Sequence, residues 1–66
     1  MKIKFKEDCL ITLVDGIGSE MDIDFHFGDI QEGEILADHG EYVSFGDQNG
    51  WKIHRLSKTL FEEVES

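Results

Sequence analysis

The feature that most constrains the fold is a series of short segments joined by glycine-containing turns between residues 27 and 56. Two of these turns, Asp38-His39-Gly40 and Asn49-Gly50, carry the glycine or the Asn-Gly pair that supplies positive φ in a primed hairpin turn. Strands joined by such short links pair antiparallel. The sequence therefore predicts a three-stranded meander, with strands at residues 30–37, 41–45 and 51–56.

Alternation assigns the two faces of the first meander strand. Glu32 and Glu34 lie on the face opposite Ile35 and Ala37, because successive side chains of a strand point to opposite faces. Gly33, in the middle of this strand, indicates a bulge or a sharp bend that would help a small sheet to curl.

Three further strands are predicted before the meander. Residues 2–6 alternate three lysines with two apolar side chains, which is typical of a half-buried strand, and the lysines favour a place at a sheet edge. Residues 9–14 are nearly all apolar or β-branched and predict a strand covered on both faces. Residues 20–27 alternate again. The apolar side chains expected to face the core from this segment are Met21, Ile23, Phe25 and Phe27.

The end of the chain predicts one 3₁₀ turn at residues 57–60 and then a last short strand, or a frayed tail, at residues 61–64. With no proline, repeat or linker, residues 1–66 are expected to form one domain. A chain of this length buries only about 60% of its unfolded surface, which disfavours a deep catalytic cleft. We therefore predict that the protein is not an enzyme.

The sequence also indicates a cellular compartment. The single Cys9 cannot form an intrachain disulfide, so a reducing environment is the simpler assumption. No apolar run approaches the roughly 20 residues of a membrane span, and no small-residue cleavage site follows the apolar part of the start of the chain. The protein is predicted to be cytoplasmic, without a membrane partner.

The order of elements resembles that of the SH3-like barrels. The residues that carry this resemblance are the turn at residues 27–29, the hairpins at His39-Gly40 and Asn49-Gly50, and Leu60-Phe61 after the 3₁₀ turn. The resemblance implies an all-β fold: a small SH3-like barrel of five or six antiparallel strands with one 3₁₀ turn before the last strand. The motifs of peptide-binding SH3 domains, an ALYDY-like run and paired tryptophans, are absent.

The charge of the chain is strongly one-sided. Fifteen Asp and Glu residues face six Lys and Arg residues, which gives a net charge of −9 at pH 7. No Lys or Arg occurs between Glu7 and Trp51, an interval that holds twelve acidic residues. Because binding to phosphates relies on Lys and Arg, direct binding to nucleic acid is disfavoured and a basic protein partner is favoured.

Carboxylates on alternate residues of a strand lie about 6.6 Å apart, and nucleic-acid phosphates recur at a similar scale, about 3.4 Å per strand along a duplex. Such a surface could occupy the nucleic-acid-binding groove of a basic protein. In size and charge the chain is similar to the small acidic proteins with which phages mimic DNA and block host defence enzymes, the anti-CRISPR proteins among them. This resemblance implies an inhibitor that acts in the host cytoplasm. The residues predicted to bind the partner are Glu20, Asp22, Asp24, Asp29, Glu32, Glu34, Asp38, Glu41, Tyr42 and Trp51.

Two other interpretations of these residues stay open. The acidic side chains could serve only to keep a small domain in solution. Alternatively, Tyr42 and Trp51 could form an exposed aromatic site through which an SH3-like adaptor holds a peptide or a cationic side chain. The chain is expected to be a monomer or a weak homodimer joined through a strand edge.

No motif predicts a metal, a cofactor or a catalytic site. Asp22-x-Asp24 begins like an EF-hand loop, but glycine is missing from the sixth position and glutamate from the twelfth. A looser cation site between Asp15, Glu20 and Asp22 is the alternative. Cys9 and the three histidines lack the paired spacing of transition-metal ligands.

Overall fold

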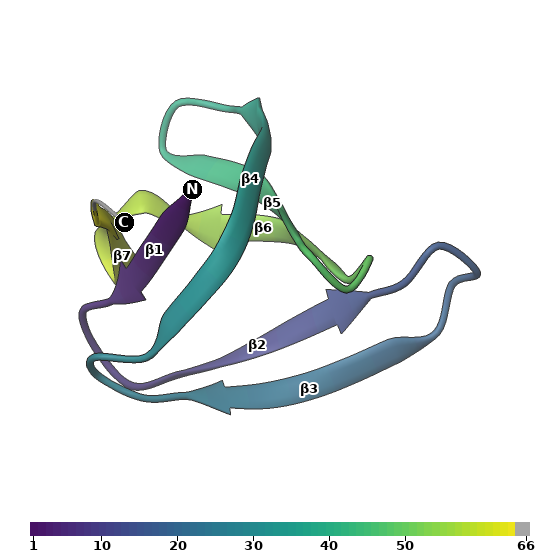
Figure 1. Ribbon diagram of the computed structural model, residues 1–66, viewed down its shortest axis with the longest axis horizontal. Helices are drawn as coiled ribbons and strands as arrows, with labels where there is room; N and C mark the ends of the chain where they lie inside the picture. Colours follow the sequence, from purple (N-terminus) through teal and green to yellow (C-terminus); the bar gives the residue numbers. More distant parts are fainter. Residues whose placement is uncertain (65–66) are drawn as a thin grey trace.

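The computed structural model describes residues 1–64, which form one antiparallel sheet of seven strands (Figure 1). The elements are β1 (Lys2–Phe5), β2 (Cys9–Val14), β3 (Glu20–Phe25), β4 (Ile30–Asp38), β5 (Tyr42–Asp47), β6 (Lys52–Ser57), the 3₁₀ turn η1 (Lys58–Leu60) and β7 (Phe61–Val64). The all-β prediction and the 3₁₀ turn before the last strand are confirmed. The number of strands is seven rather than five or six, and the sheet is open, with the order β3-β2-β6-β5-β4-β1-β7. No helix in residues 1–64 is long and apolar enough to span a bilayer.

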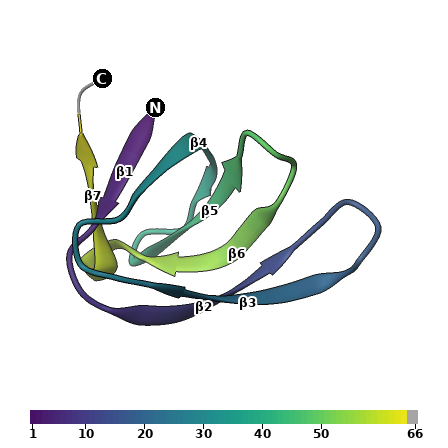
Figure 2. The same ribbon diagram turned by 60° about the horizontal axis from the view of Figure 1, so that its bottom comes forward.

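The sheet curls so strongly that strands far apart in its order share one core (Figure 2). Four strands separate β1 from β3, yet the rings of Phe5 and Phe25 stack with their centroids 4.3 Å apart. A chain this short gains a closed core in this way without a second layer. The buried apolar side chains of this core are Ile3, Phe5, Ile11, Leu13, Phe25, Val43, Phe45, Ile53, Leu56 and Phe61.

The predicted meander is confirmed, because β5 pairs with β4 on one side and with β6 on the other. Its two turns differ. The β4–β5 turn is a two-residue loop, Gly40-Glu41, closed by the His39 N–H to the Tyr42 carbonyl at 2.9 Å, and positive φ at Gly40 alone fits a primed turn of type II′ rather than I′. In the β5–β6 loop the Asp47 N–H donates to the Trp51 carbonyl at 2.8 Å, and Gly50, at φ 89°, closes a three-residue loop. The loop from Asp15 to Ser19 between β2 and β3 repeats this arrangement.

Gly33 has a different role from the predicted bulge. The register between β4 and β5 shifts between Ile35 and Ala37, so the irregularity lies beyond Gly33. This shift breaks the alternation, and Ala37 is exposed rather than facing the core. Gly33 instead permits close approach of two backbones: a Cβ there would overlap the carbonyl oxygen of Gly46 and lie 2.9 Å from the Cα of Asp47.

Three other expected environments are wrong. β1 is not an edge strand, because it pairs with both β4 and β7. β2 is covered on one face only, and Leu10 on its other face is 63% exposed. β3 ends at Phe25, and the turn that follows carries Phe27 out of the alternating pattern, leaving it 70% exposed. The alternating pattern therefore predicts which side chains share a face only within the strand, and not in the turn that follows it.

Replacement of Gly33 by alanine should destabilise the fold by about 1–3 kcal/mol, because the added methyl group forces β4 and β5 apart. The matched control is Gly16→Ala, since nothing lies within 4 Å of that position and its φ is not positive. The control should leave the free energy of unfolding unchanged or raise it by up to about 1 kcal/mol. Urea unfolding of both variants measures the difference, and equal midpoints would contradict the close approach at Gly33.

Candidate functional site

The residues predicted to bind a partner lie in several parts of the molecule. They are Glu20, Asp22 and Asp24 on β3, Glu32 and Glu34 on β4, Asp29, Asp38 and Glu41 at or beside turns, and Tyr42 and Trp51 on the β5–β6 hairpin. The two carboxylate rows, on β3 and on β4, are separated in the sheet by β2, β6 and β5. The structure therefore does not place the two carboxylate rows on neighbouring strands.

A lysine lies between the two rows. Lys52 of β6 is in register with Gly46 of β5 on one side and with Val14 of β2 on the other. Those two residues are in turn in register with Glu34 and Glu20. The cation of Lys52, which is exposed, thus interrupts the negative surface across the middle of the sheet.

The carboxylate row of β3, which we define as Glu20, Asp22 and Asp24, has no cation opposite it. The residues of β2 in register with the row are Val14, Thr12 and Leu10, none of them charged. The Thr12 hydroxyl donates to Oδ1 of Asp22 at 2.7 Å. Within residues 1–64 no Lys, Arg or His nitrogen lies within 4 Å of these three carboxylates, and all three side chains are exposed. The β3 row therefore makes no ion pair within residues 1–64, although Glu20 lines one shallow pocket together with His54 and Arg55.

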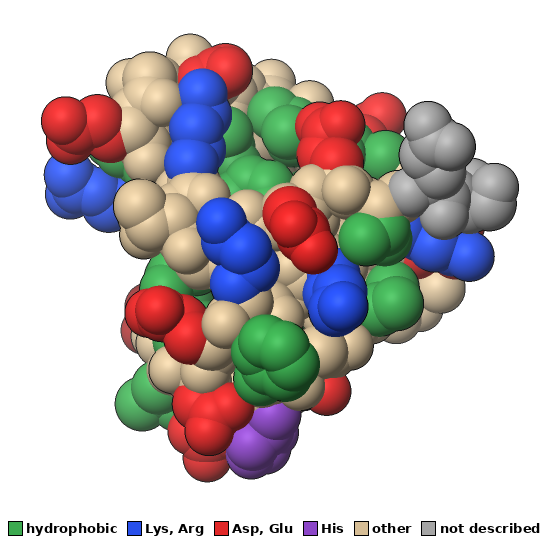
Figure 3. Space-filling model, turned by 90° about the vertical axis from the view of Figure 1, so that its left-hand side faces the viewer, with side chains coloured by type: hydrophobic (Ala, Val, Ile, Leu, Met, Phe, Trp, Pro, Cys, Tyr) green, Lys and Arg blue, Asp and Glu red, His purple; other side chains and the backbone are tan. Residues whose placement is uncertain are grey.

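Two glutamates beside β1 lie opposite lysines in the strand pairing. Lys2 is in register with Glu32 of β4, and Lys4 is in register with Glu62 of β7. Opposite charges at facing positions of neighbouring strands stabilise their pairing. Figure 3 views the molecule from the side on which β1 and β7 lie, and blue and red side chains are interspersed over it. The predicted row on β4 thus belongs to a surface of mixed charge.

Several aspartates act as hydrogen-bond acceptors for turns. Oδ1 of Asp15 accepts two backbone N–H groups of its loop at 2.9 Å, and Oδ1 of Asp47 accepts two at 2.8 and 3.0 Å. Asp38 accepts one N–H from the β4–β5 turn at 2.9 Å. The sequence carries a signal for the first two, since an aspartate stands three residues before the turn glycines Gly18 and Gly50. A count of charges does not distinguish these three aspartates from carboxylates that are free at the surface.

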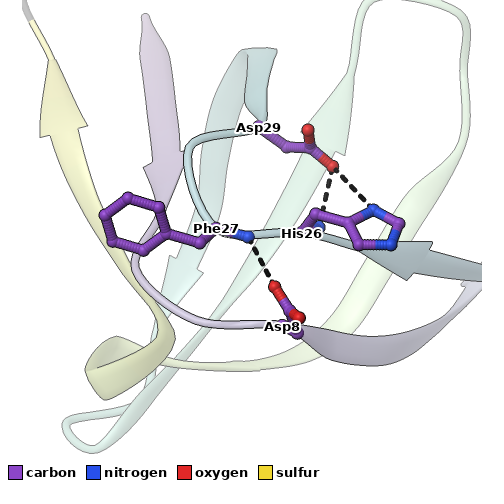
Figure 4. Close-up of polar contacts among 4 residues, drawn as sticks. All are labelled: Asp8, His26, Phe27 and Asp29. Atoms are coloured by element: carbon purple, nitrogen blue, oxygen red, sulfur yellow. Dashed lines mark hydrogen bonds and ion pairs between the residues drawn. The ribbon is translucent and has the colours of Figure 1, made fainter.

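Asp8 and Asp29 organise the turn between β3 and β4 (Figure 4). Oδ1 of Asp8 accepts the Phe27 N–H at 2.8 Å, and Oδ2 of Asp29 accepts the His26 N–H at 2.8 Å. The same Asp29 oxygen lies 3.7 Å from Nδ1 of the His26 ring. Nζ of Lys4 lies 5.8 Å from the centroid of the exposed Phe27 ring, within range of a cation–π interaction. Asp29, predicted to bind a partner, therefore has a structural role.

Tyr42 and Trp51 do not form a shared aromatic site. Tyr42 is in register with the last residue of β6, whereas Trp51 precedes its first residue, so about 20 Å of strand separates them. The Tyr42 ring stacks on His39, with centroids 4.8 Å apart, and the guanidinium carbon of Arg55 lies 4.5 Å from its centroid. Trp51 is half-buried and packs against the core. Their aromatic surfaces are partly covered by the chain itself.

Cys9 is unsuited to nucleophilic chemistry. Burial raises the pKa of its thiol, and the carboxylates of Glu7 and Asp8 raise it further. A thiol with a raised pKa is protonated at neutral pH and reacts slowly. In the part of the chain that the structure describes, no three His, Cys, Asp or Glu side chains are arranged to hold a metal ion, so the alternative cation site at the β2–β3 loop is not formed.

Comparison with known proteins finds no relative. No protein-family model matches the chain, no curated protein matches its sequence, and no solved structure matches it. Any function must therefore be inferred from the geometry and the charges described above.

The two kinds of aspartate can be distinguished by stability. Asp8→Ala should lower the free energy of unfolding by about 1 kcal/mol, because the Phe27 N–H loses its acceptor. Asp24→Ala removes the same charge but no hydrogen bond, and should change stability by less than about 0.5 kcal/mol. Thermal or urea unfolding of the pair checks this. Equal losses would show that the Asp8 contact contributes nothing beyond its charge.

The pKa of the Asp38 carboxyl is lowered from its ordinary value of 3.8, first by the hydrogen bond from Lys58 and then by that from the Gly40 N–H. Nζ of Lys58 lies 2.9 Å from Oδ1 of Asp38. Because the folded-state pKa is the lower one, the pair stabilises the fold above about pH 4, and this contribution is lost as the pH falls through the folded-state pKa. In Lys58→Gln the pKa of Asp38 should rise toward 3.8. NMR titration of the Asp38 carboxyl measures it, and an unchanged pKa would exclude Lys58 as the cause.

Proposed function

We propose that the protein is a non-enzymatic binding module whose carboxylate row on β3 occupies a basic, nucleic-acid-binding surface of a partner protein, and so inhibits that partner by DNA mimicry. The observation that supports this best is that β3 has only β2 beside it in the sheet, and that the β2 residues in register with Glu20, Asp22 and Asp24 carry no charge. The three acidic side chains project from alternate residues of one exposed strand, about 6.6 Å apart along it.

A binding role explains what a purely solubilising role does not. Uncompensated negative charge destabilises a compact fold through self-repulsion. Most other aspartates offset this by accepting hydrogen bonds from turns, and Glu32 and Glu62 lie opposite lysines. Glu20 and Asp24 have neither kind of partner, so selection for binding accounts for their charge more simply than stability does.

The arrangement of strands supports assignment to the SH3-like class as a further part of this proposal. A glycine-containing loop, a meander and a single 3₁₀ turn before the last strand follow one another in the order that the sequence analysis compared with those barrels. A scaffold of this kind binds through its surface. Recognition through Tyr42 and Trp51 together has no such support, because the two side chains lie at opposite ends of a hairpin.

The test uses the immobilised chain and proteins that elute from heparin with salt, a fraction rich in nucleic-acid-binding proteins. We expect the chain to retain a partner at low salt, and duplex DNA and added salt to release it. The variant E20K/D22K/D24K should retain none. The control E62K/E63K alters β7 instead and should keep most of the binding, although its net charge changes less. Retention that DNA does not compete with, or that survives the triple substitution, would contradict the proposal.

A further inference from the structure

β3 is a free edge of the sheet. It ends the strand order and pairs only with β2, so one row of its backbone N–H and C=O groups has no strand beside it within residues 1–64. The far end of the β2–β3 hairpin projects beyond the other strands (Figure 1 and Figure 2). A free edge of this kind can accept an extended segment as an additional strand, with main-chain hydrogen bonds contributing much of the affinity.

The two faces of β3 define the chemistry that an added strand must have. On one face lies the carboxylate row, Glu20, Asp22 and Asp24, which calls for basic side chains at facing positions. On the other face Phe25 is buried, but Ile23 is only half-buried and Met21 is 37% exposed. The chain leaves the apolar side of this edge incompletely covered. A strand alternating basic and apolar residues would complement both faces at once.

The chain itself contains an example of this complementarity. β1 alternates lysines with apolar residues, and its neighbours β4 and β7 place Glu32 and Glu62 in register with Lys2 and Lys4. Its apolar side chains, Ile3 and Phe5, are fully buried in the core. Thus β1, with its Lys-apolar-Lys pattern, has on each side a strand that places a glutamate opposite one of its lysines. β3 carries a comparable row of acidic residues, but no basic strand lies beside its free edge.

We propose that the partner is recognised by strand addition: an extended segment of alternating basic and apolar residues pairs with the free edge of β3. The proposal rests on the proposed function, since it assigns the partner of the same carboxylate row. A second copy of the chain is disfavoured as the occupant, because pairing β3 with β3 would place the carboxylates of two rows beside one another. The other edge, β7, is less suited, because it has four residues and its Glu62 already faces Lys4.

The experiment uses a synthetic peptide of alternating lysine and valine. Added to the isotope-labelled full chain, it should shift the amide signals of β3 and slow their hydrogen exchange, while leaving those of β7 unchanged. A peptide of the same sequence with N-methyl groups on the amides of one edge keeps the charge but cannot pair there. It should bind about tenfold more weakly or worse, because it cannot form the main-chain hydrogen bonds along that edge.

The outcomes separate this inference from the proposed function. If the N-methylated peptide and one with its lysines in a single block bind as tightly as the alternating peptide, strand addition is overturned, while charge-based binding survives. If the alternating peptide fails to bind at low salt, or if its binding perturbs β7 instead of β3, the inference is also wrong. A β3-to-β3 dimer in size-exclusion chromatography and exchange measurements would replace the peptide segment with a second copy as the occupant. If D22K/D24K loses binding of the alternating peptide and E62K/E63K retains it, the result supports β3 as the edge that binds the peptide.

Discussion

The contact between Phe5 and Phe25 is the one on which the rest of the structure depends. The two rings stack at 4.3 Å although four strands separate β1 from β3 in the sheet. A single layer of strands cannot bury its apolar face unless it packs against another element or curls onto itself. This chain curls, with the close approach of backbones at Gly33 and the bulge after Ile35 lying along the strand that bends. The curl also leaves β3 and β7 as the free edges.

The acidic residues of this protein fall into classes that charge counting does not distinguish. Some hold turns together through hydrogen bonds to backbone N–H groups, as Asp15 and Asp47 do. Others, such as Glu32 and Glu62, lie opposite lysines of β1. A short chain without proline depends on side chains to define its turns, and aspartate does so at the expense of added negative charge. In the β3 row, Glu20 and Asp24 accept no hydrogen bond and face no lysine, and the three carboxylates follow one another along a single free edge, which is why the proposed function rests on this row.

Much of the fold could be predicted from local patterns. The meander, the 3₁₀ turn and the last strand follow from turn residues and from short alternating runs, which act over a few residues. Errors occurred where a long-range partner decides the outcome. The lysines of β1 suggested an edge strand, but β7 returns from the end of the chain to pair beside it. The sequence predicts that Leu10 is covered, but its hairpin lies at the side of the sheet and leaves the side chain exposed.

The candidate site was predicted only in part, for the same reason. Parity placed Glu20, Asp22 and Asp24 correctly on one face of β3, because alternation depends only on the backbone of that strand. Which strand would lie beside each row depends on pairing between distant segments. That pairing separated the β3 row from the β4 row, and placed Lys52 between them. It also moved Tyr42 and Trp51 to opposite ends of a hairpin.

The sequence by itself determined the secondary structure, the sites of the turns and the excess of negative charge, since each is set by neighbouring residues or by composition. The tertiary structure alone decided which carboxylates lie opposite lysines and which strand edge stays free. The physical reason is that strand pairing brings together residues distant in the chain, as Lys4 and Glu62 are, and this pairing forms only when the curled sheet closes around its core.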